Sequence, residues 1–479
     1  MNKVFIAVLL ATALAAIEGT IVATAIPSIT ADLSGVELIS WIYSAYLLSA
    51  AIATIIFGKL ADLFGRKKMI IIGISIFVVG SLLSGLAQSM IMLIVFRAIQ
   101  GIGAGSILPI TLTMVSEIFN TEKARAKGQG YIAMVWGVSG VIGPLIGGFL
   151  VDQLSWHYIF LLNVPFGLGS LLMIAKYYKE SVTITKHKID FLGAGLFVIT
   201  TVALLLSIIE GSNTGIWNAP LQIICYIVVV IGGLLFIRTE KRASEPIIPL
   251  SLFKNKRLNV VNGLTFVIMS IVISVSVYIP IYGQSVIGHN ATKAGLMIAP
   301  LSVMWTVSAI AIGSLVGKIA NKTIIQIGTS FLVAGTAMLA FLQQDSSSIY
   351  VSISTALIGL GMGLIAPLLI ITVQAAAKKD EMGISIGLNS FTNTFSQSVG
   401  AAMFGVIFNF ITAKALRDLD KGEVQLNGAL DRSIFSDADI ATIKGIITDG
   451  SVAVYIGALV LAVIAFILAA MLQKKKPIQ

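Results

Sequence analysis

The chain alternates between long apolar runs and short polar connections. A membrane-spanning helix needs about 20 apolar residues, and fourteen of the runs are long enough to cross a bilayer. They cover residues 4–26, 39–57, 69–87, 91–114, 130–151, 159–178, 191–209, 221–238, 259–283, 296–316, 324–341, 350–370, 384–411 and 452–472. Because most connections are short, we expect an all-α polytopic membrane protein with fourteen transmembrane helices.

Composition agrees with this expectation and excludes several classes of protein. Of the 479 residues, 57% are hydrophobic and only 11% are charged. A soluble domain is about 25% charged, so the chain is no ordinary cytosolic enzyme. The net charge of +10 does not indicate a nucleic-acid partner, because the basic residues lie between apolar runs and not on one water-facing surface. One cysteine, Cys225, and three scattered histidines predict no metal and no other cofactor.

The basic residues predict the orientation in the membrane. Twenty-five of the 32 Lys and Arg residues lie at the two termini and in alternate connections, and six lie in the opposite connections. Since positively charged loops remain in the cytoplasm, we expect a cell (cytoplasmic) membrane protein with both termini cytoplasmic. The connection at 412–450 is then a long extracellular loop, and its mixed charges predict a partly helical, solvated lid or spacer.

Two short motifs recur at nearly one spacing. GKLAD at 58–62 returns as GKIAN at 317–321, an offset of 259 residues. GIGAG at 101–105 returns as GLGMG at 359–363, an offset of 258 residues. Two matches at nearly the same offset indicate an internal repeat.

The repeat predicts two homologous six-helix lobes. We expect them at residues 1–178 and 258–479, with an inserted pair of transmembrane helices and its cytoplasmic connectors at 179–257. Parallel repeats around a midplane cavity are typical of transporters.

The stretch GKLADLFGRKK at 58–68 matches the signature G-x-L-A-D-x-x-G-R-[KR]-[KR] and resembles the major facilitator superfamily. RAIQGIG at 97–103 is similar to the fourth-span element R-x-x-Q-G-x-G of that family. GPLIGG at 143–148 is similar to its antiporter element, with Ser139 at the place of an upstream glycine. The resemblance implies the major facilitator fold and glycine-rich faces that seal and open the lobes.

The same motifs indicate which residues gate the conformational change. Asp62 can pair with Arg66 one turn later, and Glu117 either braces Arg66 or is simply solvated. Pro144 is expected to kink its span. The predicted gating residues are Gly58, Asp62, Gly65, Arg66, Glu117, Gly143, Pro144, Gly147 and Gly148.

Three further stretches resemble the fourteen-span drug:proton antiporters of this superfamily, the quaternary-ammonium and multidrug efflux pumps. IEGTIVATAIP at 17–27 is similar to their L-D-x-T-I-V-N-x-A-L-P run, with Glu18 and Ala23 in place of Asp and Asn. WHYIFLLNVPFG at 156–167 is similar to W-R-W-I-F-x-x-N-x-P-x-G, with His in place of Arg. PIIPL at 246–250 resembles the connector after their inserted pair. The departures fall at the predicted site, so the substrate range of relatives is not carried over.

Two charged side chains lie well inside predicted spans. Glu18 lies eight residues, about 12 Å, from the outer end of span one, and Arg97 lies six residues, about 9 Å, from the outer end of span four. We therefore expect them to meet in the outer half of the cavity. Ionisable groups in membrane spans are functional candidates by default. The pair either couples proton movement to transport or is a structural ion pair.

Span thirteen carries three amide side chains at a spacing of four residues: Asn389, Asn393 and Gln397. This spacing places them on one helical face. They either face the cavity or form hydrogen bonds between helices. Aromatic side chains either form cavity walls or only pack. The predicted substrate-binding residues are Glu18, Tyr46, Gln100, Trp136, Trp305, Asn389, Asn393 and Gln397.

Together these observations predict a secondary active transporter and not an enzyme. We expect a monomeric, proton-coupled exporter of lipophilic cationic drugs and dyes that works by alternating access, with small molecules, protons and the bilayer as its partners. A dedicated proton-coupled exporter of one physiological solute, such as a lipid precursor, an amino acid or a siderophore, stays open. So does a non-transporting membrane receptor or scaffold.

Overall fold

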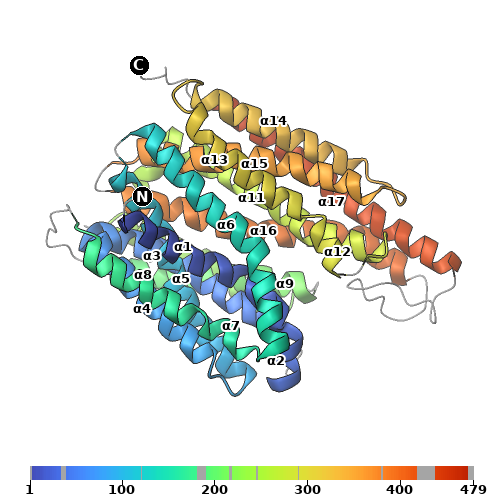
Figure 1. Ribbon diagram of the computed structural model, residues 1–479, viewed down its shortest axis with the longest axis horizontal. Coiled ribbons are helices and arrows are strands. Elements are labelled where there is room, and N and C mark those ends of the chain that lie inside the picture. Colours follow the sequence, from blue (N-terminus) through green and yellow to red (C-terminus); the bar gives the residue numbers. More distant parts are fainter. Residues whose placement is uncertain are drawn as a thin grey trace. The chain divides into compact units, whose positions relative to one another are not determined.

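A computed structural model describes residues 3–33, 39–119, 121–180, 190–214, 218–243, 246–289, 291–378, 381–417 and 437–472. The described residues are helical apart from short turns and one isolated bridge between Val316 and Ile319 (Figure 1). This confirms the predicted all-α class.

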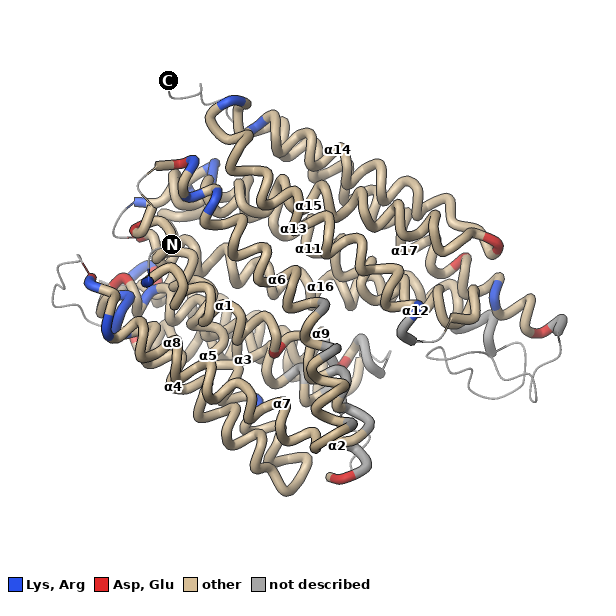
Figure 2. The backbone as a smooth tube through the Cα atoms, in the orientation of Figure 1, with Lys and Arg blue, Asp and Glu red and all other residues tan. Residues whose placement is uncertain are grey.

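Thirteen helices in the described residues are long and apolar enough to cross a membrane, and α6 covers the remaining predicted span at 130–151. Charged residues gather towards helix ends, and most of each helix carries none (Figure 2). The helices are α1 (Lys3–Ile21), α2 (Ile26–Leu33), α3 (Ile39–Phe64), α4 (Arg66–Ser84), α5 (Met90–Ile118), α6 (Glu122–Gln153), α7 (His157–Leu161), α8 (Asn163–Tyr177), α9 (Phe191–Thr214), α10 (Pro220–Glu240), α11 (Lys256–Ser285), α12 (Ala291–Leu296), α13 (Ala299–Leu315), α14 (Asn321–Ala340), α15 (Ser348–Ala376), α16 (Met382–Arg417) and α17 (Asp437–Met471).

Two predicted spans are not single helices. Span one divides into α1, the 3₁₀ turn η1 (Val22–Ala25) and α2. Span six divides into α7 and α8 at Leu162. Pro27 and Pro165 follow these breaks, and a proline has no backbone N–H to give to the carbonyl four residues earlier. The second break places Asn163 at the beginning of a new helix.

The turn between spans two and three is tighter than the sequence predicted. We expected a connection over 58–68, but α3 continues to Phe64 and α4 begins at Arg66. Only Gly65 separates the two helices, with φ of +90°. Glycine adopts that conformation without steric cost because it has no Cβ, so one residue is enough to reverse the chain.

The predicted outer connection at 412–450 is also shorter at both ends. The helix α16 reaches Arg417 and α17 begins at Asp437; residues 418–436 lie outside the described part of the chain. At 1.5 Å per residue the 35 residues of α17 span about 52 Å. A bilayer core is about 30 Å thick, so about 20 Å of this helix extends beyond it.

The chain separates into two compact units. Unit 1 comprises residues 1–207, 218–261 and 370–394, and unit 2 comprises 208–217, 262–369 and 395–479. In unit 1, α3 and α4 pack along α5, while α1 packs on α6 and α8. In unit 2, α14 packs on α17. The predicted division into lobes and an inserted pair stays a prediction.

The fourth-span repeat has a structural counterpart in both units. The helices α5 and α15 each contain 29 residues, begin 258 residues apart and enclose a proline. A Cβ on Gly105 would meet the carbonyl oxygen of Ala50, and a Cβ on Gly363 would meet that of Trp305. Each glycine therefore lets its helix lie directly against a neighbour.

The register of the other repeat is wrong. The contacts with Ala50 and Trp305 pair α3 with α13 at an offset of 255 residues, not 259. Gly58 lies inside α3, whereas Gly317 lies in the turn before α14 with φ of +89°. At the structural offset Gly58 corresponds to Gly313. The match between 58–62 and 317–321 joins segments of different local structure.

Candidate functional site

Four packed helices of unit 1 bring charged and polar side chains together at one buried point. The helices are α1, α4, α5 and α8 (Figure 1). Here Arg97 donates through Nη1 to Glu18 Oε1, so the contact expected from the two depths is present. Their exposed side-chain fractions are 1% and 0%.

Arg97 is held on several sides. Its Nε donates to the carbonyl of Ile42 over 3.3 Å, and its Nη1 also donates to Gln100 Oε1 over 2.8 Å. The guanidinium lies 4.1 Å from the centre of the Tyr46 ring, close enough for a cation–π interaction. A buried charge is tolerated only when it is paired and hydrogen-bonded in this way.

Two further members of the cluster, Ser81 and Asn163, were not predicted as site residues. Asn163 Nδ2 lies 2.6 Å from Glu18 Oε2 and 3.0 Å from Ser81 Oγ. Gln100 Nε2 also donates to Ser81 Oγ, over 3.0 Å, and the Ser81 hydroxyl donates to the carbonyl of Phe160. Asn163 carried one signal in the sequence, its place in the antiporter-like run at 156–167; Ser81 carried none.

An apolar layer covers one side of this polar cluster. It contains buried residues from α1, η1, α2, α3, α5 and α7, among them Ile21, Leu93 and Phe160. These three lie three or four residues, about one helical turn, from Glu18, Arg97 and Asn163 along the same chain segments. They lie towards the turn between α4 and α5, the end that the predicted topology places outside.

The predicted substrate-binding residues differ in accessibility. Tyr46, Gln100 and Asn389 are buried like Glu18. Trp136 on α6 is 42% exposed. Trp305 on α13 and Asn393 and Gln397 on α16 are partly exposed. Their contacts with a substrate stay predictions.

The predicted gating motif forms a second polar network within unit 1. The Asp62 carboxylate accepts hydrogen bonds from the backbone N–H groups of Gly383 and Ile384, each over 2.9 Å. These residues begin α16, so a side chain of α3 caps another helix and meets the positive end of its dipole. A Cβ on Gly58 would lie 2.8 Å from the Gly383 oxygen, which requires glycine there.

Arg66 continues this network on the other side of Gly65. It pairs with Asp62 over 3.5 Å and with Glu117 over 2.5 Å, so the expected bracing contact of Glu117 is present. Tyr178 donates its hydroxyl to Glu117. The acid Glu180 accepts the backbone N–H of Arg66.

The antiporter-like glycines differ in their surroundings. The Thr20 hydroxyl donates to the Ser139 carbonyl over 3.1 Å, and a Cβ on Gly143 would meet that hydroxyl. Gly147 is buried, whereas a Cβ on Gly148 would meet nothing within 4 Å. The backbone of α6 continues as a helix through Pro144. Close approach of α1 and α6 therefore depends on Gly143.

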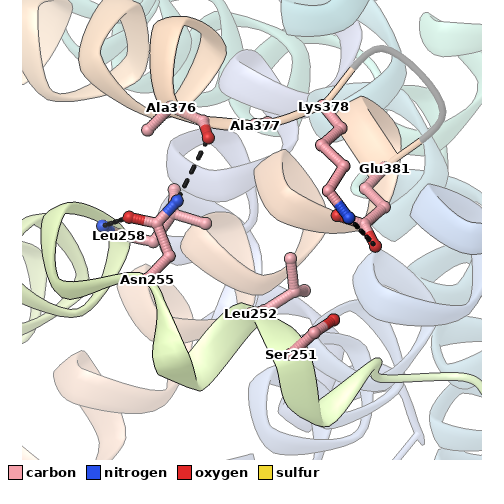
Figure 3. Close-up of a pocket in the computed structure, with 8 residues that line it drawn as sticks. All are labelled: Ser251, Leu252, Asn255, Leu258, Ala376, Ala377, Lys378 and Glu381. Atoms are coloured by element: carbon pink, nitrogen blue, oxygen red, sulfur yellow. Dashed lines mark hydrogen bonds and ion pairs between the residues drawn. The ribbon is translucent and has the colours of Figure 1, made fainter.

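No group of three or more His, Cys, Asp or Glu side chains in the described residues could hold a metal ion. A cavity of about 160 Å³ lies between the beginning of α11 and the end of α15 (Figure 3). Asn255 crosses it to the carbonyl of Ala376 over 3.1 Å, and Lys378 pairs with Glu381 at its edge over 3.7 Å. The cavity is too small for a drug-sized ligand.

Comparison with known proteins agrees with the resemblance. The model of the Major Facilitator Superfamily matches residues 8–401. Multidrug resistance protein 3 of Bacillus subtilis (strain 168) is 34% identical over 419 residues, which cover 88% of this chain and 82% of that protein. Multidrug transporter protein MdtP of the same strain is 34% identical over 403 residues, with 84% and 74% covered.

Solved structures show the same fold at low sequence identity. The human organic anion transporter MFSD10 (TETRAN) superposes with a TM-score of 0.65 at 14% identity, covering 98% of this chain and 99% of that one. The proton:xylose symporter XylE superposes with a TM-score of 0.63 at 12% identity, covering 95% and 94%.

Proposed function

Because the chain belongs to the Major Facilitator Superfamily and is a multi-pass membrane transporter, not an enzyme, we propose that it is a proton-coupled exporter of lipophilic cations. The transporters named above for multidrug resistance and multidrug transport support the substrate class. The observation that carries the proposal is the fully buried pair of Glu18 and Arg97.

The buried carboxyl provides the coupling. Removal of water favours the neutral, protonated form of a carboxyl, whereas a neighbouring guanidinium favours the ionised form. Both effects act on Glu18, because its carboxyl is buried and contacts Arg97. A small change of surroundings then decides whether it carries a proton. When the site opens and the contact with Arg97 loosens, an ionised Glu18 attracts an organic cation and a proton displaces that cation.

Two closures in unit 1 support alternating access. We propose that the apolar layer that contains Ile21 and Phe160 closes the path from Glu18 to one end of the unit. At the other end, Asp62 fixes the beginning of α16 to α3. We propose that each closure opens in turn and that the pair of Glu18 and Arg97 meets only one side of the membrane at a time. We expect the Asp62 closure to face the cytoplasm, because positively charged termini and loops remain there. We also expect the protein to act as a monomer in a cell membrane.

Glu18 is the one acid that lies well inside a predicted span, which gives a simple stoichiometry. If one proton enters for each monovalent cation that leaves, transport is electroneutral. The pH gradient alone then drives it, at about 1.36 kcal/mol or about tenfold accumulation per pH unit.

Transport in proteoliposomes tests the proposal. Protein inserted inside-out, with an acidic lumen, should accumulate a fluorescent monovalent cation about tenfold per pH unit. Glu18→Gln should abolish this accumulation, while Asp345→Asn, a change of an exposed acid in the connection after α14, should not. Undiminished accumulation by Glu18→Gln contradicts proton coupling through Glu18. Accumulation driven by membrane potential alone contradicts the electroneutral exchange.

The same vesicles separate a multidrug exporter from an exporter dedicated to one solute. Mutual competition among chemically unrelated cations is expected of the first. A dedicated exporter would transport one of them and ignore the rest.

A further inference from the structure

The hydrogen bonds around Glu18 all point towards it. Arg97 donates to Oε1, and the Asn163 amide donates to Oε2 over 2.6 Å. A carboxylate with no proton accepts at both oxygens and donates at neither. This arrangement therefore suits the ionised form of Glu18 and gives a protonated Glu18 no acceptor.

Most of the neighbouring groups cannot reverse their direction. Arg97 has donors only. The Gln100 carbonyl is occupied by Arg97, so its amide nitrogen must face Ser81. The Ser81 hydroxyl donates its one proton to the carbonyl of Phe160 over 2.9 Å.

Asn163 is different because its side chain has both kinds of group. A rotation of 180° about its last side-chain bond exchanges the NH₂ donor for the carbonyl acceptor. Its partner Ser81 Oγ also accepts from Gln100 and donates to the carbonyl of Phe160, so Ser81 keeps these two hydrogen bonds when Asn163 turns. The other titratable groups that face Glu18, Arg97 and Tyr46, cannot replace it, because Arg97 has no acceptor and Tyr46 places its ring against Arg97.

We propose that Asn163 is a positioning residue that reverses its amide when Glu18 takes up a proton. It donates to the ionised carboxylate and accepts from the protonated one. The cluster thus satisfies both states of Glu18 without moving Arg97. This inference rests on the proposed proton coupling and adds the group that makes both states possible.

Infrared difference spectroscopy of the full chain in lipid, between acidic and alkaline pH, tests the reversal. The unmodified protein should show a carboxyl band of Glu18 and a shift of an asparagine amide band, identified with isotope-labelled asparagine. Asn163→Leu, of similar volume, should remove the amide shift and keep the carboxyl band. Glu18→Gln should remove both.

Each outcome has one meaning. An amide shift that is absent from the unmodified protein, or that survives in Asn163→Leu or Glu18→Gln, overturns the inference. If the carboxyl band assigned to Glu18 survives unchanged in Glu18→Gln, that band belongs to another acid and the proposed coupling through Glu18 is overturned instead. The two failures are therefore distinguishable.

Transport adds a readout that a merely structural residue would not change. Loss of a hydrogen bond to a charged group corresponds to about 10- to 100-fold. Asn163→Leu should therefore slow pH-driven exchange at least tenfold and move the pH of half-maximal exchange. Ser170→Ala is the matched control, because Ser170 lies on the same helix, is buried and donates to the carbonyl of Ala7 without contacting Glu18. An unchanged pH profile in Asn163→Leu, or an equal shift in Ser170→Ala, contradicts the inference.

Discussion

Removal of the Asp62 carboxylate should release the beginning of α16 from α3. The carboxylate is 3% exposed and accepts two backbone N–H groups, each over 2.9 Å. A hydrogen bond to a charged group contributes about 1.5–3 kcal/mol, so Asp62→Ala should destabilise the contact by at least about 3 kcal/mol. Asp62→Asn retains one acceptor oxygen but no charge, and it should cost about 1–1.5 kcal/mol.

The alkylation rate of a single thiol near this contact measures the release. Cys225 is the only cysteine, so Cys225→Ser provides a background without thiols. Ser385→Cys introduces a thiol at a buried position whose hydroxyl has no hydrogen-bond partner. Since about 1.36 kcal/mol is a factor of ten, Asp62→Ala should accelerate its alkylation about 100-fold, and Asp62→Asn about tenfold.

Ser84→Cys is the matched control. Ser84 is also buried and unpartnered, but it lies at the opposite end of α4 from Arg66. Its alkylation rate should not respond to Asp62→Ala. If Ser385→Cys reacts equally fast with and without Asp62→Ala, the cap does not hold the two helices together and the reasoning is refuted.

Two further predictions compare pairs of glycine substitutions. Gly143→Ala should lower the melting temperature and transport activity because its Cβ would meet Thr20, whereas Gly148→Ala, which meets nothing within 4 Å, should change neither. Equal melting temperatures for the two variants would contradict tight packing of α1 on α6. Gly65→Ala and Gly317→Ala should each cost about 1–2 kcal/mol of backbone strain, because both have φ near +90°. Only Gly65→Ala also displaces Glu180, whose carboxylate lies 2.5 Å from the new Cβ, so chemical denaturation should show it to be the less stable; the reverse order would refute that.

The sequence predicted the helices better than their ends. Apolar runs of bilayer length leave one way to satisfy the backbone in lipid, so every predicted span has a helical counterpart. Helix ends depend on single residues instead: Gly65 allows α3 to continue to Phe64, and Pro165 divides span six. The repeat was placed four residues out of register, because a five-letter match carries no information about which backbone atoms approach.

The two charges of the candidate site and two of its neutral members, Tyr46 and Gln100, were predicted as site residues from the sequence. Glu18 and Arg97 were identified because ionisable residues are rare within apolar spans, and their depths agreed. Ser81 and Asn163 are neutral side chains of a kind that occurs in many membrane helices. No pattern distinguished Ser81, and Asn163 was marked only by its place in the antiporter-like run at 156–167. Their role depends on how α8 packs against α1 and α4, and the sequence carries no signal for that packing.

Comparison of equivalent packing positions in the two units indicates that the charge of Arg97 is not needed to build the fold. Arg97 satisfies the carbonyl of Ile42 in unit 1 over 3.3 Å, and Thr355 satisfies that of Met297 in unit 2 over 3.0 Å. The two donors are 258 residues apart and the two carbonyls 255, the same offsets that relate α15 to α5 and α13 to α3. A neutral hydroxyl is therefore sufficient at this packing position. The guanidinium brings into the membrane a charge that costs several kcal/mol unless it is paired, and its charged partner is Glu18. This favours a coupling role for the pair over a purely structural one.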